Sequence, residues 1–173
     1  MPQPEPARSS DPVISAMLSI WADQGRYLAR LVSDLRDEDL ATQPVSGVVM
    51  NHPAWVLAHL ALYPPVMTAM LRGLPFQDPK HGRFWMGTRP SSERGEYPAR
   101  AELVDGYLAA REETARALAE AGPARLAEPT PLERWREQYP RLAHVLFHLM
   151  FEHESGHLGQ ISAWRRAGGR PSV

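Results

Sequence analysis

The sequence RLAHVLFHLMFEHESGHLGQISAWRRA, residues 141–167, contains no proline and carries apolar side chains at helical spacing. At about 100° per residue, its main apolar residues fall within one arc of the helix surface. Pro140 precedes this segment and Gly168-Gly169 follows it, in the positions that favour the start and the end of a helix. The segment therefore predicts one long amphipathic helix that buries a single face.

Three earlier segments have the same periodicity. Asp11-Pro12 is a helix N-cap followed by proline at the first helical position, and the apolar pattern then continues to Leu35. A second helix is predicted from residue 51 to residue 63, with a kink or restart at Pro64-Pro65. A third fits residues 99–121, with Gly122 as its stop.

The fold class follows from these four segments. Residues 72–97 are rich in Gly, Pro and charge and are predicted to form a long loop, while no useful β-alternation is present. Four long amphipathic helices predict an all-α fold, a four-helix bundle with a long loop between helices 2 and 3. The Pro-rich residues 1–10 are expected to be a disordered leader, and residues 11–173 a single domain.

Composition excludes several classes of function. The net charge of -1 gives no electrostatic argument for binding nucleic acid. There are no cysteines, which excludes disulfides, thiolate metal sites and a cysteine nucleophile. The first residues lack the apolar core of a signal peptide, and no apolar run is judged long enough to span a bilayer. A cytoplasmic protein without a membrane partner is the expectation.

The last helix contains His153-Glu-Ser-Gly-His157, an H-E-x-x-H match. Two imidazoles four residues apart lie one above the other on a helix and can bind one metal ion. The familiar interpretation is a zinc protease whose Glu is the general base. However, the common protease arrangements take a third ligand from downstream, and residues 158–173 contain no His, Asp, Glu or Cys. A third protein ligand must therefore come from upstream.

His59 is the upstream candidate, because it is centred on the apolar stripe of the second predicted helix. His153 and His157 lie at about 180° and 220° from His144, in the middle of the apolar face of the last helix. His144 and His148 form a second pair at about 0° and 40°, on the opposite side. A lone buried histidine is usually a hydrogen-bonded core residue, but one metal ion would satisfy three inward-facing imidazoles together.

The chain resembles the DinB-like superfamily in two stretches, Asn51-His-Pro-Ala-Trp-Val-Leu-Ala-His59-Leu and His153-Glu-Ser-Gly-His157-Leu-Gly-Gln160-Ile. The resemblance covers roughly residues 11–169. It implies an up-down-down-up four-helix bundle, usually dimeric, with a divalent metal on His59, His153 and His157. The superfamily includes thiol-dependent enzymes, such as mycothiol-dependent maleylpyruvate isomerase and bacillithiol transferases, and many members without a known reaction.

Three histidine ligands would leave a coordination position open for a small-molecule substrate or water, as in catalytic sites. Imidazoles suit zinc, nickel or iron, and manganese is also considered. With no cysteine, a thiol-dependent S-transferase would need an external low-molecular-weight thiol. The alternatives are a metal-dependent hydrolase and a non-catalytic metal-binding bundle in the stress response.

Two polar residues beside the histidines are candidates for supporting roles. Glu154 is expected to be a general base or a residue that supports the ligands from beside them, and otherwise a partner in a solvent or inter-helix salt bridge. Gln160 lies one turn from His157, so it is expected either to hydrogen-bond that ligand or to be a merely buried amide.

Apolar residues of the last helix also point away from the predicted metal face. Phe147, Phe151 and Leu158 are expected on its outer side. A bundle helix needs only one buried stripe, so the extra apolar surface, together with the resemblance, predicts a homodimer that buries this side.

Overall fold

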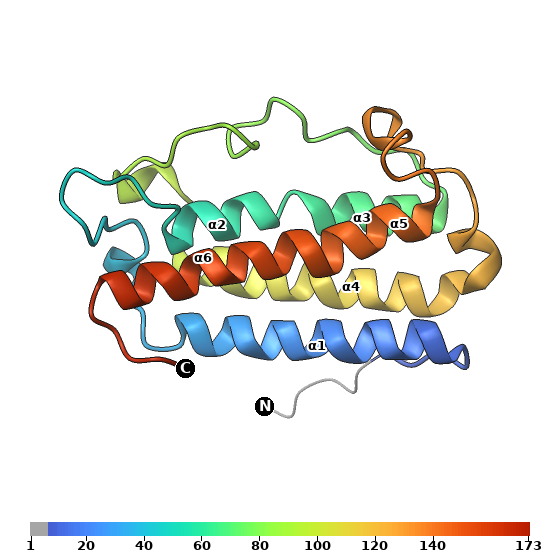
Figure 1. Ribbon diagram of the computed structural model, residues 1–173, viewed down its shortest axis with the longest axis horizontal. Coiled ribbons are helices and arrows are strands. Elements are labelled where there is room, and N and C mark those ends of the chain that lie inside the picture. Colours follow the sequence, from blue (N-terminus) through green and yellow to red (C-terminus); the bar gives the residue numbers. More distant parts are fainter. Residues whose placement is uncertain (1–6) are drawn as a thin grey trace.

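The computed structural model describes residues 7–173 and consists of four helical rods packed side by side (Figure 1). The rods are α1 (Pro12–Val32), α2 with α3 (Pro53–Leu60, Tyr63–Arg72), α4 (Arg100–Leu126), and α5 (Leu142–Phe147) continued through η4 (His148–His153) into α6 (Glu154–Ala167). Short 3-10 turns, η1 to η3, lie at Asp37–Asp39, Arg94–Glu96 and Glu133–Trp135. The predicted all-α four-helix bundle is confirmed. Its division into a leader over residues 1–10 and a domain over 11–173 stays a prediction, since residues 1–6 lie outside the described part.

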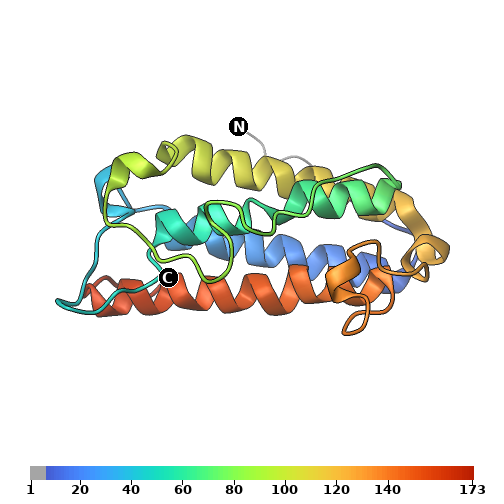
Figure 2. The same cartoon turned by 90° about the horizontal axis from the view of Figure 1, so that it is seen from above.

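The rods follow an up-down-down-up order. In Figure 1, α1 and the last rod run from right to left, whereas α2–α3 and α4 run from left to right. α1 contacts α4 and α6, and α2 contacts the same two helices, so the first and second rods lie diagonally opposite. Because α3 and α4 are parallel, residues 73–99 return along the whole bundle, outside α2 and α3 (Figures 1 and 2).

Local sequence explains most helix ends. The Asp11 carboxylate accepts hydrogen bonds from the backbone N–H groups of Val13 and Ile14, as an N-cap should. The second rod breaks and restarts at Tyr63, so Pro64 and Pro65 fall in the first turn of α3, where their missing N–H groups leave no hydrogen bond unmade. The predicted restart is therefore confirmed.

Two predicted boundaries are wrong. The first helix ends at Val32, and Leu35 lies beyond it in a turn while remaining in the core. Gly122 takes a left-handed φ of 68° and breaks the helical conformation, but the chain does not stop there. Pro123 follows at once, its fixed φ suits a first helical turn, and helix resumes to Leu126. Gly122 is therefore a kink.

The last rod is continuous but contains a π-helical turn, His148–His153, that the sequence did not predict. A π turn holds one residue more than an α turn, so the residues after it are rotated by about 100°. Leu158, expected on the outer face, is 2% exposed and packs in the core. The prediction for Leu158 is wrong because the angular count assumed an unbroken α-helix.

One helical stretch of the described chain, Pro53–Arg72, is long and apolar enough to cross a membrane, contrary to the sequence-based expectation. In the bundle, 72% of its most apolar window is buried. Its contacts with α4 and α6 account for this composition, as in a core helix of a soluble protein.

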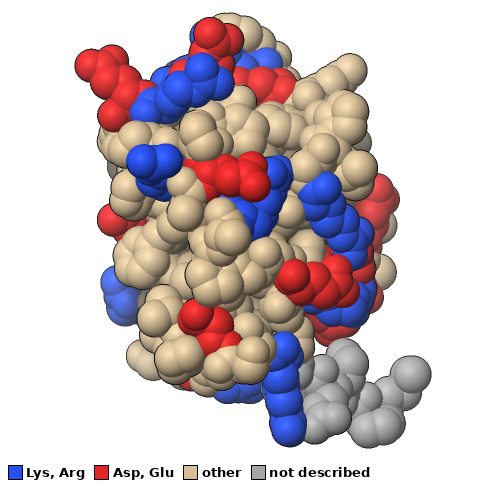
Figure 3. All heavy atoms as spheres, turned by 90° about the vertical axis from the view of Figure 1, so that its right-hand side faces the viewer, with Lys and Arg blue, Asp and Glu red and all other residues tan. Residues whose placement is uncertain are grey.

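The end of the bundle that holds the start of α1 carries charged side chains of both signs (Figure 3). Arg125 pairs with Glu128 there, next to the helix end at Leu126. With a net charge of -1 for the whole chain, this face offers no one-sided basic surface of the kind that binds nucleic acid.

Candidate metal centre

His59 lies on α2 with its imidazole buried and its two ring nitrogens in different surroundings. Nδ1 is 2.7 Å from the carbonyl oxygen of Phe84, which belongs to the long loop. A carbonyl can only accept, so Nδ1 carries the proton and Nε2 keeps a free lone pair. The Trp55 ring stacks on the imidazole at 5.0 Å and 5°. The loop and α2 therefore fix both the tautomer and the ring plane of His59.

His153 and His157 come from the last rod and meet His59 at one point. The Nε2 atoms of His59 and His153 are 2.9 Å apart, and the ring of His157 lies 4.6 Å from each of the other two rings. One nitrogen from each of the three imidazoles lies within 4.8 Å of the others. The structure thus gathers the three histidines that the sequence singled out, from helices far apart in the chain.

The π turn changes how the histidines of the last rod are arranged. In an α-helix, residues five apart point about 140° away from each other, whereas in a π turn they lie on one face. His148 was predicted on the side opposite His153, yet their ring centroids are 6.0 Å apart. That prediction is wrong. His148 instead stacks on Tyr139 at 4.6 Å and hydrogen-bonds Glu152.

His157 is held by an amide from its own helix. Its Nδ1 donates to Oε1 of Gln160 at 2.9 Å, and the same oxygen accepts a hydrogen bond from Asn51 at 3.0 Å. This leaves Nε2 of His157 unprotonated, the form that binds metal. Gln160 therefore touches His157, as its direction suggested. The sequence did not predict this contact of Asn51, which precedes α2.

Glu154 lies in the bundle interior and not beside the imidazoles. Its carboxylate accepts hydrogen bonds from Trp21 Nε1 at 2.7 Å and Tyr107 OH at 2.9 Å, and pairs with Arg111 at 2.9 Å. Burial raises the pKa of Glu154, and the Arg111 charge opposes that shift. Of the roles left open by the sequence, these contacts are those of the inter-helix salt bridge.

The electrostatics of the cluster favour neutral imidazoles. Burial and the neighbouring histidines lower the pKa of His153 to about 2, and burial and His59 lower that of His157 to about 4. Burial also lowers the pKa of His59. Neutral imidazole is the form that coordinates a metal, so this donor set fits a divalent cation such as zinc, nickel or iron.

Aromatic side chains from α3 and from two loops lie next to the cluster. Tyr63 contacts the rings of both His59 and His153, and Trp135 stacks on Tyr63. Arg134 lies over the Trp85 and Trp135 rings and forms two hydrogen bonds to Asp78, which joins the two loops. Sequence reasoning missed Arg134 and Trp135, because isolated loop residues carry no periodic signal.

Comparison with protein-family models identifies the DinB superfamily, whose model matches residues 21–161. That span includes His59, His153, His157 and Gln160. No curated protein sequence matches the chain.

Replacing His59, His153 or His157 by alanine should each remove most of the bound divalent metal, because two imidazoles hold an ion far less tightly than three. Elemental analysis of protein purified without an affinity tag would measure this. His144→Ala is the matched control, since His144 is exposed on the same rod and lies outside the cluster. A His144 variant that loses as much metal as the others would contradict the ligand set.

The metal-free protein should lose stability as pH falls below about 6.5, the ordinary pKa of histidine. His153 and His157 have lowered pKa values in the folded chain, so below pH 6.5 the unfolded chain binds more protons. Each group contributes a slope of up to about 1.4 kcal/mol per pH unit between its folded and unfolded pKa values. Urea unfolding in chelator from pH 7 to pH 5 would measure the slope. His153→Gln should make it shallower, and equal slopes would contradict the assignment.

Proposed function

Because the chain belongs to the DinB superfamily, we propose that it is a divalent-metal-dependent transferase whose nucleophile is an external low-molecular-weight thiol. The main support for this proposal is the composition of the histidine cluster. Within residues 7–173, the group of candidate ligands contains three imidazoles and no fourth His, Cys, Asp or Glu. His153 and His157 are only half-buried, so a small molecule can approach the point that they share. Such an open arrangement is typical of catalytic sites.

A divalent ion held by His59, His153 and His157 would supply a Lewis acid that makes a thiolate accessible near neutral pH. The chain contributes the rest through its own residues. Phe84 and Gln160 hold the protons of two ligands on Nδ1, away from the shared point. Trp55 and Tyr63 are almost fully buried against the imidazoles and keep water off one side. With no cysteine in the chain, the sulfur must arrive with a cosubstrate.

The hydrolase alternative would need a carboxylate that accepts a proton near the cluster. Glu154 was the candidate, but its carboxylate is occupied by Trp21, Tyr107 and Arg111. This observation favours the transferase over the hydrolase. A thiol cosubstrate also agrees with a cytoplasmic location, where small thiols are kept reduced. A metal-binding bundle without catalysis, acting in the stress response, is the remaining alternative.

We also propose that a second copy of the chain covers the side formed by α1 and the last rod. Val13 and Ile20 on α1 and Phe147 on α5 are more than half exposed, although all three are large and apolar. On α6, a Cβ added to Gly156 or Gly159 would touch nothing in the chain. Glycine costs helix stability, so its presence at an open surface fits the close approach of another backbone.

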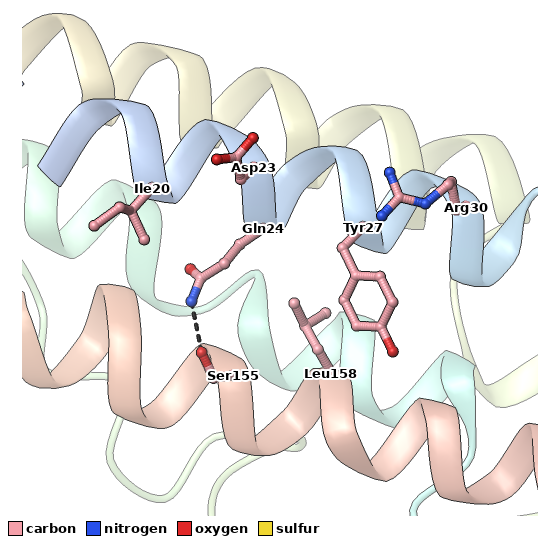
Figure 4. A pocket seen from close by; sticks show the side chains of 7 residues that line it. All are labelled: Ile20, Asp23, Gln24, Tyr27, Arg30, Ser155 and Leu158. Carbon is pink, nitrogen blue, oxygen red and sulfur yellow. Dashed lines mark hydrogen bonds between the residues drawn. The ribbon is translucent and has the colours of Figure 1, made fainter. Parts of the chain in front are cut away.

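A groove between α1 and α6 lies on this side (Figure 4). Gln24 reaches across it to the Ser155 hydroxyl at 2.5 Å, and Ile20 lines it. Asp23 and Arg30 stand two helical turns apart along its α1 wall. A two-fold axis between them would place each carboxylate against the partner's guanidinium, so the side is complementary to itself in charge.

The metal-loaded protein should consume an electrophilic model substrate only when a low-molecular-weight thiol is added. Absorbance assays with and without thiol would measure this, and His157→Ala should abolish turnover while His144→Ala retains it. Turnover without thiol would replace the transferase by a hydrolase. No turnover with a broad panel of thiols and esters would leave the non-catalytic bundle as the function.

The chain should have the mass of a dimer in solution at micromolar concentration, as measured by light scattering. Ile20→Glu should shift the mass to that of a monomer, because it buries a charge at the interface. Val48→Glu is the control, since Val48 is similarly exposed but lies just before α2. A monomeric mass for the unmodified chain would contradict the proposed dimer.

A further inference from the structure

We infer that Glu154 is a positioning residue whose carboxylate, held by Arg111, keeps the last rod in the π register that directs His153 and His157 at His59. The inference rests on the proposed ligand set and adds a role for the acidic residue of the H-E-x-x-H sequence. Glu154 is 1% exposed and stands where η4 joins α6, directly after one proposed ligand.

The Glu154 carboxylate has its hydrogen-bond and ion-pair partners on two other rods. Trp21 on α1 and Tyr107 on α4 both donate hydrogen bonds to Oε2, at 2.7 Å and 2.9 Å. Nη2 of Arg111, also on α4, lies 2.9 Å from Oε1. A side chain with partners on two neighbouring helices cannot turn about its own helix axis without breaking those contacts. These contacts therefore fix the rotation of the last rod about its own axis at residue 154.

Arg111 is itself held rigidly. Its Nη2 donates to the Trp21 carbonyl oxygen at 2.6 Å, and its guanidinium lies 4.4 Å from the Trp21 ring centre. A Cβ at Gly25 would stand 2.1 Å from Nη1 of Arg111, so only glycine leaves room for this guanidinium. The cation thus occupies a fixed place between α1 and α4, and Glu154 must come to it.

Two registers of the last rod differ by one residue. Leu142 and Leu146 are buried before the turn and Leu149 at its start, and regular α-helical spacing would continue that core stripe at positions 153, 157 and 160. In the structure the buried positions come one residue later, at Glu154, Leu158 and Ile161. The π turn thereby moves His153 and His157 from the centre of the core to its half-exposed edge, where they face α2.

The interactions of the Glu154 carboxylate favour one of these two registers over the other. In the regular register, Glu154 would point about 100° away from Arg111 and leave that buried guanidinium without its carboxylate partner. A π turn is itself unfavourable and rare, so an interaction elsewhere must stabilise it. The ion pair and two hydrogen bonds at Glu154 supply that stabilisation. The cluster of imidazoles depends on a carboxylate that does not touch it.

The test uses Co²⁺, whose visible absorption reports ligand geometry independently of activity. Glu154→Gln keeps the size of the side chain but removes its charge. It should weaken Co²⁺ binding at least about tenfold, as loss of a residue that orients ligands does, and should change the absorption bands. Arg111→Met should do the same, and the double variant should be no worse than either single one, because both remove the same ion pair.

Tyr107→Phe removes one donor without changing the ring, which keeps the test valid if the charge variants fail to fold. It should produce a smaller band shift in the same direction. Glu113→Gln is the control, since Glu113 forms ion pairs with Arg72 and Arg116 at the surface and is not part of the histidine cluster. Folded Glu154 and Tyr107 variants with unchanged bands and affinity would overturn the positioning role. Unmodified protein that binds no Co²⁺ would overturn the ligand set itself.

Discussion

The ion pair between Arg111 and Glu154 lies where α1, α4 and the last rod meet, and much of the molecule is arranged around it. Two charges withdrawn from water are costly, and removing one partner of such a pair typically costs about 3–5 kcal/mol. The chain offsets this cost with Trp21, Tyr107 and the space above Gly25. A buried pair of this kind is a poor source of stability but a strict condition on geometry, because only one rotation of the last rod satisfies it.

A second constraint comes from the direction of the helices. Since α3 and α4 run in parallel, the chain needs a connection that returns along the bundle, and residues 73–99 provide it. This connection lies over α2 and brings the Phe84 carbonyl oxygen to Nδ1 of His59. Asp78 in the same loop binds Arg134 in the next one. The topology thus supplies the groups that orient one imidazole and cover the cluster.

The fold and three residues of the candidate site could be predicted from the sequence, for identifiable reasons. His59, His153 and His157 sit on apolar stripes of period 3.6, so their convergence could be predicted. The π turn could not be predicted, because a shift of one residue in the apolar pattern still leaves an apparently continuous apolar stripe along the last rod. The errors for His148 and Leu158 both follow from that shift. Arg111 was missed although the sequence carries a signal for it, since it stands four residues after Tyr107 and three before Thr114, on the buried stripe of α4.

The order of the four rods along the chain also affects how the chain folds. His59 and His153 are 94 residues apart, and every contact between their helices closes a long loop. Closing such loops costs chain entropy before the contacts repay it, so folds rich in distant contacts form more slowly than bundles of successive hairpins. The three imidazoles come together only where α2 packs against the last rod, so the candidate metal site exists only once these distant helices have met.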